Sequence, residues 1–187
     1  MSGTSHIAVG VAATAVVVSQ IEPEFSFIGM GIALFIAYIS SLLPDLDHPK
    51  GKAHRLAGPL QFLTRWLARK GIFGRHRTLT HSIIGSIPIL ILGWFLIFQF
   101  DVHVYIAYVG WGFVIGWLFH LFADTLTVAG VRFFWPFWKR SFGLKMCASG
   151  GFVDRSLPII MPLVTAIFIF QRFLPGGSVI QFVQTLV

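Results

Sequence analysis

The chain has 187 residues, of which 56% are hydrophobic and only 11% are charged, and its mean hydropathy is +0.80. A soluble domain carries about 25% charged residues, so the composition excludes a soluble globular protein and predicts an integral membrane protein. Lys and Arg number 14 against 7 Asp and Glu. Membrane topology explains this basic excess better than nucleic-acid binding does, and we expect no nucleic-acid partner. A single cysteine, Cys147, excludes an internal disulfide and a multi-cysteine metal site.

Five apolar runs are long enough to cross, or nearly cross, a membrane: Ile7 to Ile21, Phe25 to Leu43, Ser82 to Phe100, His103 to Phe122 and Leu157 to Leu174. A hydrocarbon core needs about 20 apolar residues in helical conformation. The first run is the shortest, which predicts a short, tilted or re-entrant helix. The sequence therefore predicts an all-α polytopic membrane bundle of about five membrane-embedded helices, in a single domain over residues 1–187.

Basic residues are concentrated in two polar segments, 44–81 and 123–156, which interrupt the apolar runs. If each run crosses once, these segments share a side of the membrane with the N-terminus, and that side holds 13 of the 14 basic residues. Basic segments stay on the cytoplasmic side. The N-terminus and both segments are therefore predicted to face the cytoplasm, where anionic lipid headgroups are expected partners.

Alternate threading also brings four polar groups to the cytoplasmic ends of the spans. In chain order they are His6; Asp45, Asp47 and His48 in LPDLDHPKG; His76, Arg77, Thr80 and His81 in GRHRTLTHS; and His120 and Asp124 in HLFADTLTVAG. We expect these groups to lie together where the hydrocarbon begins.

The residue types in these groups suit divalent metal binding. His120 and Asp124 are four residues apart and so share one face of a helix. Imidazoles with carboxylates are the ligand set of zinc, manganese and iron. Several carboxylates leave room for two or three ions, an arrangement suited to displacement at phosphorus. A purely structural polar cap is the alternative, and we favour metal binding because most acids and histidines gather at one boundary.

Other polar and aromatic residues have more than one interpretation. Arg77 is predicted either to bind a substrate phosphate or to anchor the chain at headgroups. The strip 131–138, VRFFWPFW, is predicted to be a membrane anchor in the interface, with a substrate-lining wall as the alternative. His54 and His103 are expected to be interfacial polar residues.

The order H…LPDLDHPKG…HRTLTHS…HLFADTLTVAGVRFFWP resembles the YdjM-like family of bacterial inner-membrane proteins, described as membrane-bound metal-dependent hydrolases. The similarity runs from His6 to about Trp138. It implies that the metal ligands are His6, Asp45, Asp47, His76, His81, His120 and Asp124. His48 lies outside the required pattern. Arg75 and Thr78 stand where the family often has glycine, a departure that leaves the histidines in place and bears on how the loop packs.

These observations predict a metal-dependent hydrolase in the bacterial inner membrane, with Zn or Mn as the favoured metal and its active site facing the cytoplasm. The expected substrate is a phosphoester or ester of a lipid, or a small phosphoester reached from the cytoplasm. Asp47 is the favoured general base, and Arg77 is the second predicted catalytic residue. A transporter and a non-catalytic metal-binding scaffold are the alternatives. No acidic or histidine residue lies in the middle of a run, which argues against a translocation path.

Overall fold

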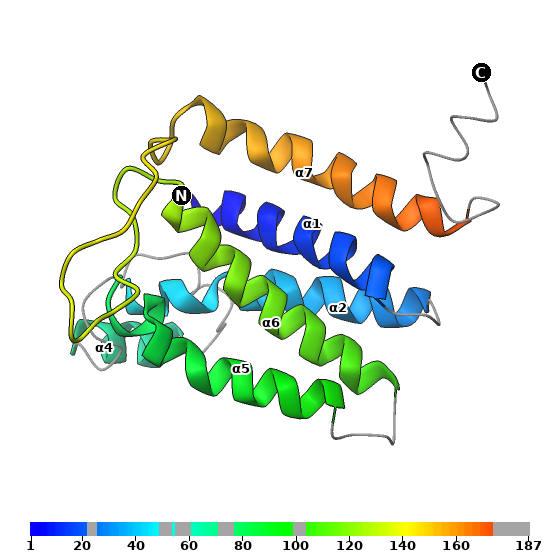
Figure 1. Cartoon of the computed structure of the whole chain (residues 1–187), viewed down its shortest axis with the longest axis horizontal. Helices are drawn as coiled ribbons and strands as arrows, with labels where there is room; N and C mark the ends of the chain where they lie inside the picture. The colour runs from blue at the N-terminus through cyan, green and yellow to red at the C-terminus, as the bar shows by residue number, and fades with distance from the viewer. Residues whose placement is uncertain (22–25, 49–53, 55–60, 71–76, 99–103, 174–187) are drawn as a thin grey trace.

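A computed structural model describes residues 1–21, 26–48, 54, 61–70, 77–98 and 104–173 of the chain. Over these residues the regular structure is helical (Figure 1). The elements are α1 (Gly3–Ile21), α2 (Phe27–Ser40), η1 (Leu43–Asp47), α4 (Gln61–Arg69), η3 (Leu79–His81), α5 (Ile83–Phe98), α6 (Val104–Thr125), α7 (Phe152–Phe170) and η4 (Gln171–Phe173).

Four segments of the described chain are long and apolar enough to cross a membrane, which confirms the predicted polytopic helical bundle. They are Gly3–Ile21, Phe27–Asp47, Tyr105–Thr125 and Phe152–Phe170. The remaining predicted span, Ser82 to Phe100, forms the shorter apolar helix Ile83–Phe98. The first span is longer than predicted because its helix begins at Gly3 and takes in the polar residues before Ile7.

Helix α6 lies at the centre of the bundle, in contact with α1, α2 and α5, while α7 packs on the outer side of α1 (Figure 1). The close approach of α6 to α2 depends on small residues. A Cβ atom on Gly112 would meet the backbone carbonyl of Ala33, and one on Gly116 would lie 2.8 Å from the carbonyl oxygen of Ala37. Small residues spaced four apart allow membrane helices to pack backbone against backbone, so these positions fix where α6 lies.

Helix α7 presents most of its length to the surroundings, and Asp154 is its buried residue. The Asp154 carboxylate accepts hydrogen bonds from the backbone N–H groups of Ser2 and Gly150, and the Asp154 carbonyl accepts one from the Ser5 hydroxyl. These bonds tie the start of α7 to the start of α1. The exposed apolar side chains of α7 suit contact with lipid.

All the segments that carry the predicted site meet at one end of the bundle. Helices α1, α5 and α7 begin at this end, and α2 and α6 end there (Figure 1). The short 3-10 turn η1 follows α2 at this end, and the short 3-10 turn η3 precedes α5 there. The helix ends that carry the described polar motifs therefore meet, as predicted.

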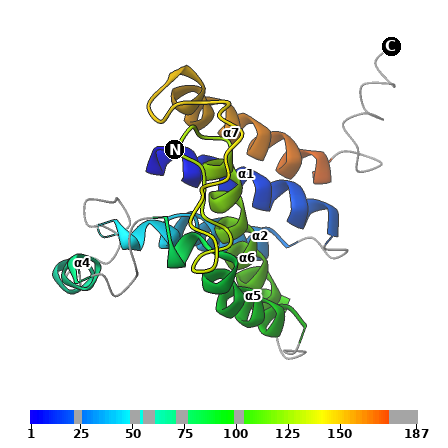
Figure 2. The same ribbon diagram turned by 60° about the vertical axis from the view of Figure 1, so that its left-hand side comes forward.

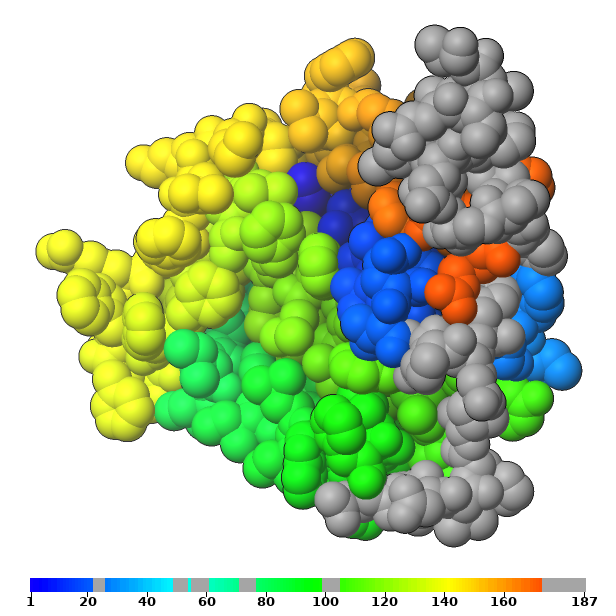
Figure 3. Space-filling model, turned by 45° about the vertical axis from the view of Figure 1, so that its right-hand side comes forward, coloured from blue at the N-terminus to red at the C-terminus, as the bar shows by residue number. Residues whose placement is uncertain are grey.

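Two surface segments at this end combine aromatic and basic side chains. Helix α4 stands beside the bundle (Figure 2) and exposes Phe62, Leu63 and Trp66. Residues 126–148 form an irregular excursion, closed by the bridges Thr127–Cys147 and Val131–Phe142, which projects from the surface (Figure 3, yellow). Exposed aromatics beside cations are typical of the membrane interface, so both segments suit the headgroup level.

Candidate metal centre

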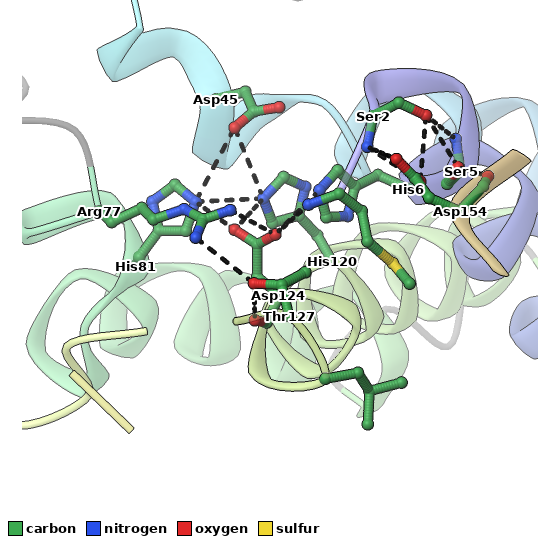
Figure 4. A network of polar contacts seen from close by, with 12 residues as sticks. Ser2, Ser5, His6, Asp45, Arg77, His81, His120, Asp124, Thr127 and Asp154 are labelled. Carbon is green, nitrogen blue, oxygen red and sulfur yellow. Dashed lines mark hydrogen bonds and ion pairs between the residues drawn. The ribbon is translucent and has the colours of Figure 1, made fainter. Parts of the chain in front are cut away.

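Four elements contribute side chains to a compact polar cluster at the site end of the bundle (Figure 4). His6 comes from α1, Asp45 from η1, His81 from η3, and His120 and Asp124 from successive turns of α6. The three histidines and Asp124 are buried, and Asp45 is partly exposed. Burying so many ionisable groups is costly unless they are paired or bind a metal.

Four ligand-type atoms converge at the middle of the cluster. The Nε2 atoms of His81 and His120 lie 3.1 Å apart. Asp45 Oδ1 is 3.9 Å from the first and 3.8 Å from the second of these nitrogens. Asp124 Oδ2 lies opposite, 3.6 Å from His81 Nε2 and 4.0 Å from His120 Nε2. The two imidazole nitrogens therefore lie near one oxygen from each carboxylate, and Asp45, His81 and His120 form a compact group that could hold a metal ion.

Hydrogen bonds on the far side of each imidazole determine which nitrogen carries the proton. His120 Nδ1 lies 2.6 Å from the carbonyl oxygen of Ser41, which can only accept, so Nδ1 donates. The Thr80 hydroxyl donates to Asp47 Oδ2 at 2.8 Å, and its oxygen therefore accepts from His81 Nδ1 at 3.0 Å. In the neutral imidazoles both Nε2 lone pairs then face each other. Such outer bonds are typical of metal-ligating histidines.

Asp124 uses its two carboxylate oxygens differently. Oδ1 is surrounded by donors: Arg77 Nη2 at 2.8 Å, His6 Nε2 at 3.2 Å and the Met1 amine at 2.7 Å. Oδ2 is buried and has no hydrogen-bond partner within the described part of the chain. An unpaired buried carboxylate oxygen beside two imidazole lone pairs is a strong indication of a cation-binding position.

His6 lies on the other side of His120 from His81. The His6 and His120 rings stack with centroids 3.8 Å apart, and His6, His120 and Asp124 form a second group whose ligand-type atoms are all within 4.8 Å of one another. His6 Nδ1 is buried and unpartnered among the described residues. His6 therefore lies where it could act as a metal ligand together with His120 and Asp124, in line with its predicted role.

Asp47 is placed behind His81, away from the convergence point. Its Oδ2 accepts from the backbone N–H of Arg77 at 2.9 Å and from Thr80, and lies 3.4 Å from His81 Nδ1. Neither compact ligand group of the described chain includes Asp47. Asp47 is thus placed to orient His81, and its predicted roles as metal ligand and general base stay predictions.

The guanidinium of Arg77 forms contacts within the protein, and its predicted role in binding a phosphate or headgroups stays a prediction. Its Nη1 donates to the carbonyl of Gly130 at 3.1 Å while Nη2 pairs with Asp124. The backbone of Arg77 has φ 60°, a left-handed conformation that turns the chain sharply before His81. Arg77 therefore links the loop before η3 to the end of α6.

The remaining predicted residues fall outside the cluster or outside the described chain. His76 and His103 lie outside the described residues. His48 caps η1 through its backbone N–H. His54, expected at the interface, is instead buried, with its ring nitrogens 2.9 Å from Thr64 Oγ1 and 3.0 Å from the His48 carbonyl oxygen.

Sequence reasoning assigned no role to Ser41 or Thr80, which orient the two central imidazoles. Thr80 stands next to His81 within a motif already recognised, so its position was the available signal. Ser41 acts through its backbone carbonyl, which is exposed to His120 because α2 ends at Ser40. Every residue type has a backbone carbonyl, so the identity of Ser41 could not predict this contact.

Replacing Thr80 by Val is expected to weaken metal binding by about 10–100-fold, the usual cost of losing an outer-shell partner. The change removes the acceptor for His81 Nδ1 and the donor to Asp47 while keeping the side-chain shape. Metal affinity is measured by titration against a competing chelator. Thr165→Val is the matched control, since the Thr165 hydroxyl bonds only its own helix. Equal affinity of the two variants would contradict the orienting role.

The fold and cluster define a polytopic membrane protein with a buried His/Asp group able to hold a metal ion. The sequence model of the YdjM inner membrane protein family matches residues 1–181. The chain belongs to this family. It is 31% identical over 147 residues to the inner membrane protein YdjM of Escherichia coli K12, and equally to that of Shigella flexneri. These matches cover 74% of the chain and 64% of each relative.

The chain therefore spans somewhat less than two thirds of the length of these relatives. No solved structure matches the chain significantly. Family membership and the apolar helices together support a multi-pass location in the inner membrane.

Proposed function

We propose that the protein is a metal-dependent hydrolase that acts on a phosphoester or ester near the lipid headgroups. The observation that carries the proposal is the convergence of His81 Nε2, His120 Nε2, Asp45 Oδ1 and Asp124 Oδ2. Two neutral imidazole lone pairs at 3.1 Å repel each other unless a proton or a metal ion lies between them. The unpartnered Asp124 Oδ2 adds a negative charge at the same point.

The residues present fit one divalent ion. Two nitrogens that each lie about 2.0–2.1 Å from a tetrahedral zinc are about 3.3 Å apart, close to the 3.1 Å between the two Nε2 atoms. His120 offers a single nitrogen, because Nδ1 is bonded to Ser41. Asp124 Oδ1 is already occupied by cationic donors. The ion we propose lies at the His81–His120 pair, held by Asp45, His81 and His120 with Asp124 Oδ2 close by, and Zn or Mn suits this ligand set. The second group, of His6, His120 and Asp124, leaves room for a further ion.

A bound divalent ion lowers the pKa of water and stabilises negative charge that develops on a substrate. The chain's own residues determine how a substrate reaches this centre. Asp45 is the partly exposed member of the central four, so the open side of the site lies toward η1 and the membrane boundary. Arg77 holds Asp124 in place through Oδ1. We propose that this open side faces the cytoplasm, in line with the predicted topology.

The proposal is tested by assaying the purified full chain in neutral detergent with lipid and soluble phosphoesters and carboxylic esters, after loading with Zn, Mn or Mg. The expected result is turnover that a chelator abolishes, that the metal restores, and that Asp45→Ala removes. Ser156→Ala is the control, because the Ser156 hydroxyl bonds only its own helix.

Two outcomes would favour other functions. Stoichiometric metal without turnover of any of these substrates would point to a metal-binding scaffold. Metal movement across sealed proteoliposomes, lost in Asp45→Ala, would point to a transporter. Either result would overturn the hydrolase assignment.

A further inference from the structure

A surface pocket lies at the same end of the bundle as the metal centre. Its volume is about 340 Å³, and it is lined by Thr78, Arg132, Trp135 and Lys139. Among the described residues, the lining holds two cations and no acidic side chain. No described carboxylate forms an ion pair with Arg132 or Lys139, so their charge remains available for an external anion.

Two chain segments that line the pocket also contact residues of the metal centre. Thr78 follows Arg77, whose guanidinium pairs with Asp124, and precedes His81 by three residues. Arg132 follows Gly130, whose carbonyl accepts from the same guanidinium at 3.1 Å. The backbone N–H of Ile83 donates to the carbonyl of Phe133, which fixes the pocket segment against the start of α5. The pocket is therefore linked to the metal centre through Arg77, which contacts both Asp124 and Gly130.

The surroundings of the pocket place it at headgroup level. Phe137 is 89% exposed and Trp138 is 58% exposed, and both lie within three residues of Trp135. Aromatic side chains that project beside cations are typical of the boundary between acyl chains and headgroups. The anions present at that level are phosphates, which Arg and Lys bind through charge-assisted hydrogen bonds.

We propose that this pocket binds the phosphate group of the substrate, through Arg132 and Lys139. This inference rests on the proposed hydrolase and deepens it, because it selects a phosphoester over a carboxylic ester. The phosphate belongs either to a lipid headgroup or to a soluble phosphoester.

The test uses the full chain in neutral detergent, with binding measured by native mass spectrometry or equilibrium titration. The probes are dioleoyl phosphatidic acid, dioleoylglycerol, which lacks the phosphate, and inorganic phosphate. The wild type is expected to prefer phosphatidic acid over dioleoylglycerol. The Arg132→Gln/Lys139→Gln double variant is expected to bind phosphatidic acid at least about 10-fold more weakly, through loss of both charge-assisted contacts.

The matched control is Arg69→Gln/Arg155→Gln, which removes the same charge from two exposed positions outside the pocket. Its affinity is expected to stay close to that of the wild type. If the wild type binds inorganic phosphate and the pocket variant does not, the substrate is a soluble phosphoester. If the wild type binds phosphatidic acid but not inorganic phosphate, the substrate is a lipid. Equal loss in both double variants, or no preference for a phosphate-bearing probe, would overturn the proposal.

Metal content is measured on the same samples. Unchanged metal in the pocket variant separates phosphate binding from the metal centre. A wild type that binds phosphate through the pocket but holds no metal would refute the hydrolase and leave the phosphate site standing.

Discussion

Replacing His120 by Ala is expected to abolish stoichiometric metal binding. His120 supplies one of the two facing nitrogens, and its ring also stacks on His6. Its loss leaves Asp45, His81 and Asp124 without the ligand that joins the two compact groups. Losing an outer-shell partner costs about 10–100-fold in affinity, and loss of a ligand is expected to exceed that range. Metal content after purification, measured by inductively coupled plasma mass spectrometry, provides the readout.

The control for this variant is His54→Ala. His54 is also a fully buried imidazole, but its ring bonds Thr64 and the His48 carbonyl, outside the cluster. This variant is expected to keep its metal even if its stability falls. Loss of metal from both variants in proportion to their loss of folded protein would show that the His120 effect is structural.

The second large effect is expected from Gly112→Val. A Cβ atom at this position collides with the backbone carbonyl of Ala33, which cannot move without displacing α2. Overpacking typically costs 1–3 kcal/mol, and about 3 kcal/mol or more is expected here because the obstacle is main chain. His120 and Asp124 lie further along the same helix, so metal affinity should fall together with the thermal unfolding temperature.

Gly31→Val provides the matched comparison, because a Cβ atom on Gly31 meets no atom within 4 Å. The Gly31 variant is expected to unfold close to the wild-type temperature and to retain metal. A Gly112 variant as stable as the Gly31 variant would contradict the close α2–α6 packing on which the position of the site depends.

The bundle and the meeting of the polar motifs were predictable from sequence for a simple physical reason. Each span must satisfy its own backbone hydrogen bonds in lipid, so hydropathy identifies the helices, and alternate crossing determines which ends meet. His6, Asp45, His81, His120 and Asp124 consequently come together as expected. Helix lengths were less well predicted, since Gly3 to His6 are too polar to extend the apolar run but still continue the helix.

The division of roles within the cluster could not be predicted, because it depends on how a few tightly bent residues turn. Asp45 and Asp47 are two residues apart in a short 3-10 turn, and the turn directs one to each side of His81. The spacing within the motif gives no basis for assigning different roles to the two carboxylates. The contacts of Arg77 with Asp124 and Gly130 could not be predicted either, because they depend on its left-handed backbone and on tertiary structure.

The most direct test of the metal centre is X-ray absorption spectroscopy on the wild-type chain purified without chelator and loaded with zinc. One zinc per chain is predicted, coordinated by two imidazole nitrogens and by oxygen, at the distances usual for these ligands, with no sulfur. Absence of stoichiometric metal after loading, or a coordination shell without imidazole, would contradict the assignment of His81, His120, Asp45 and Asp124 as its ligands.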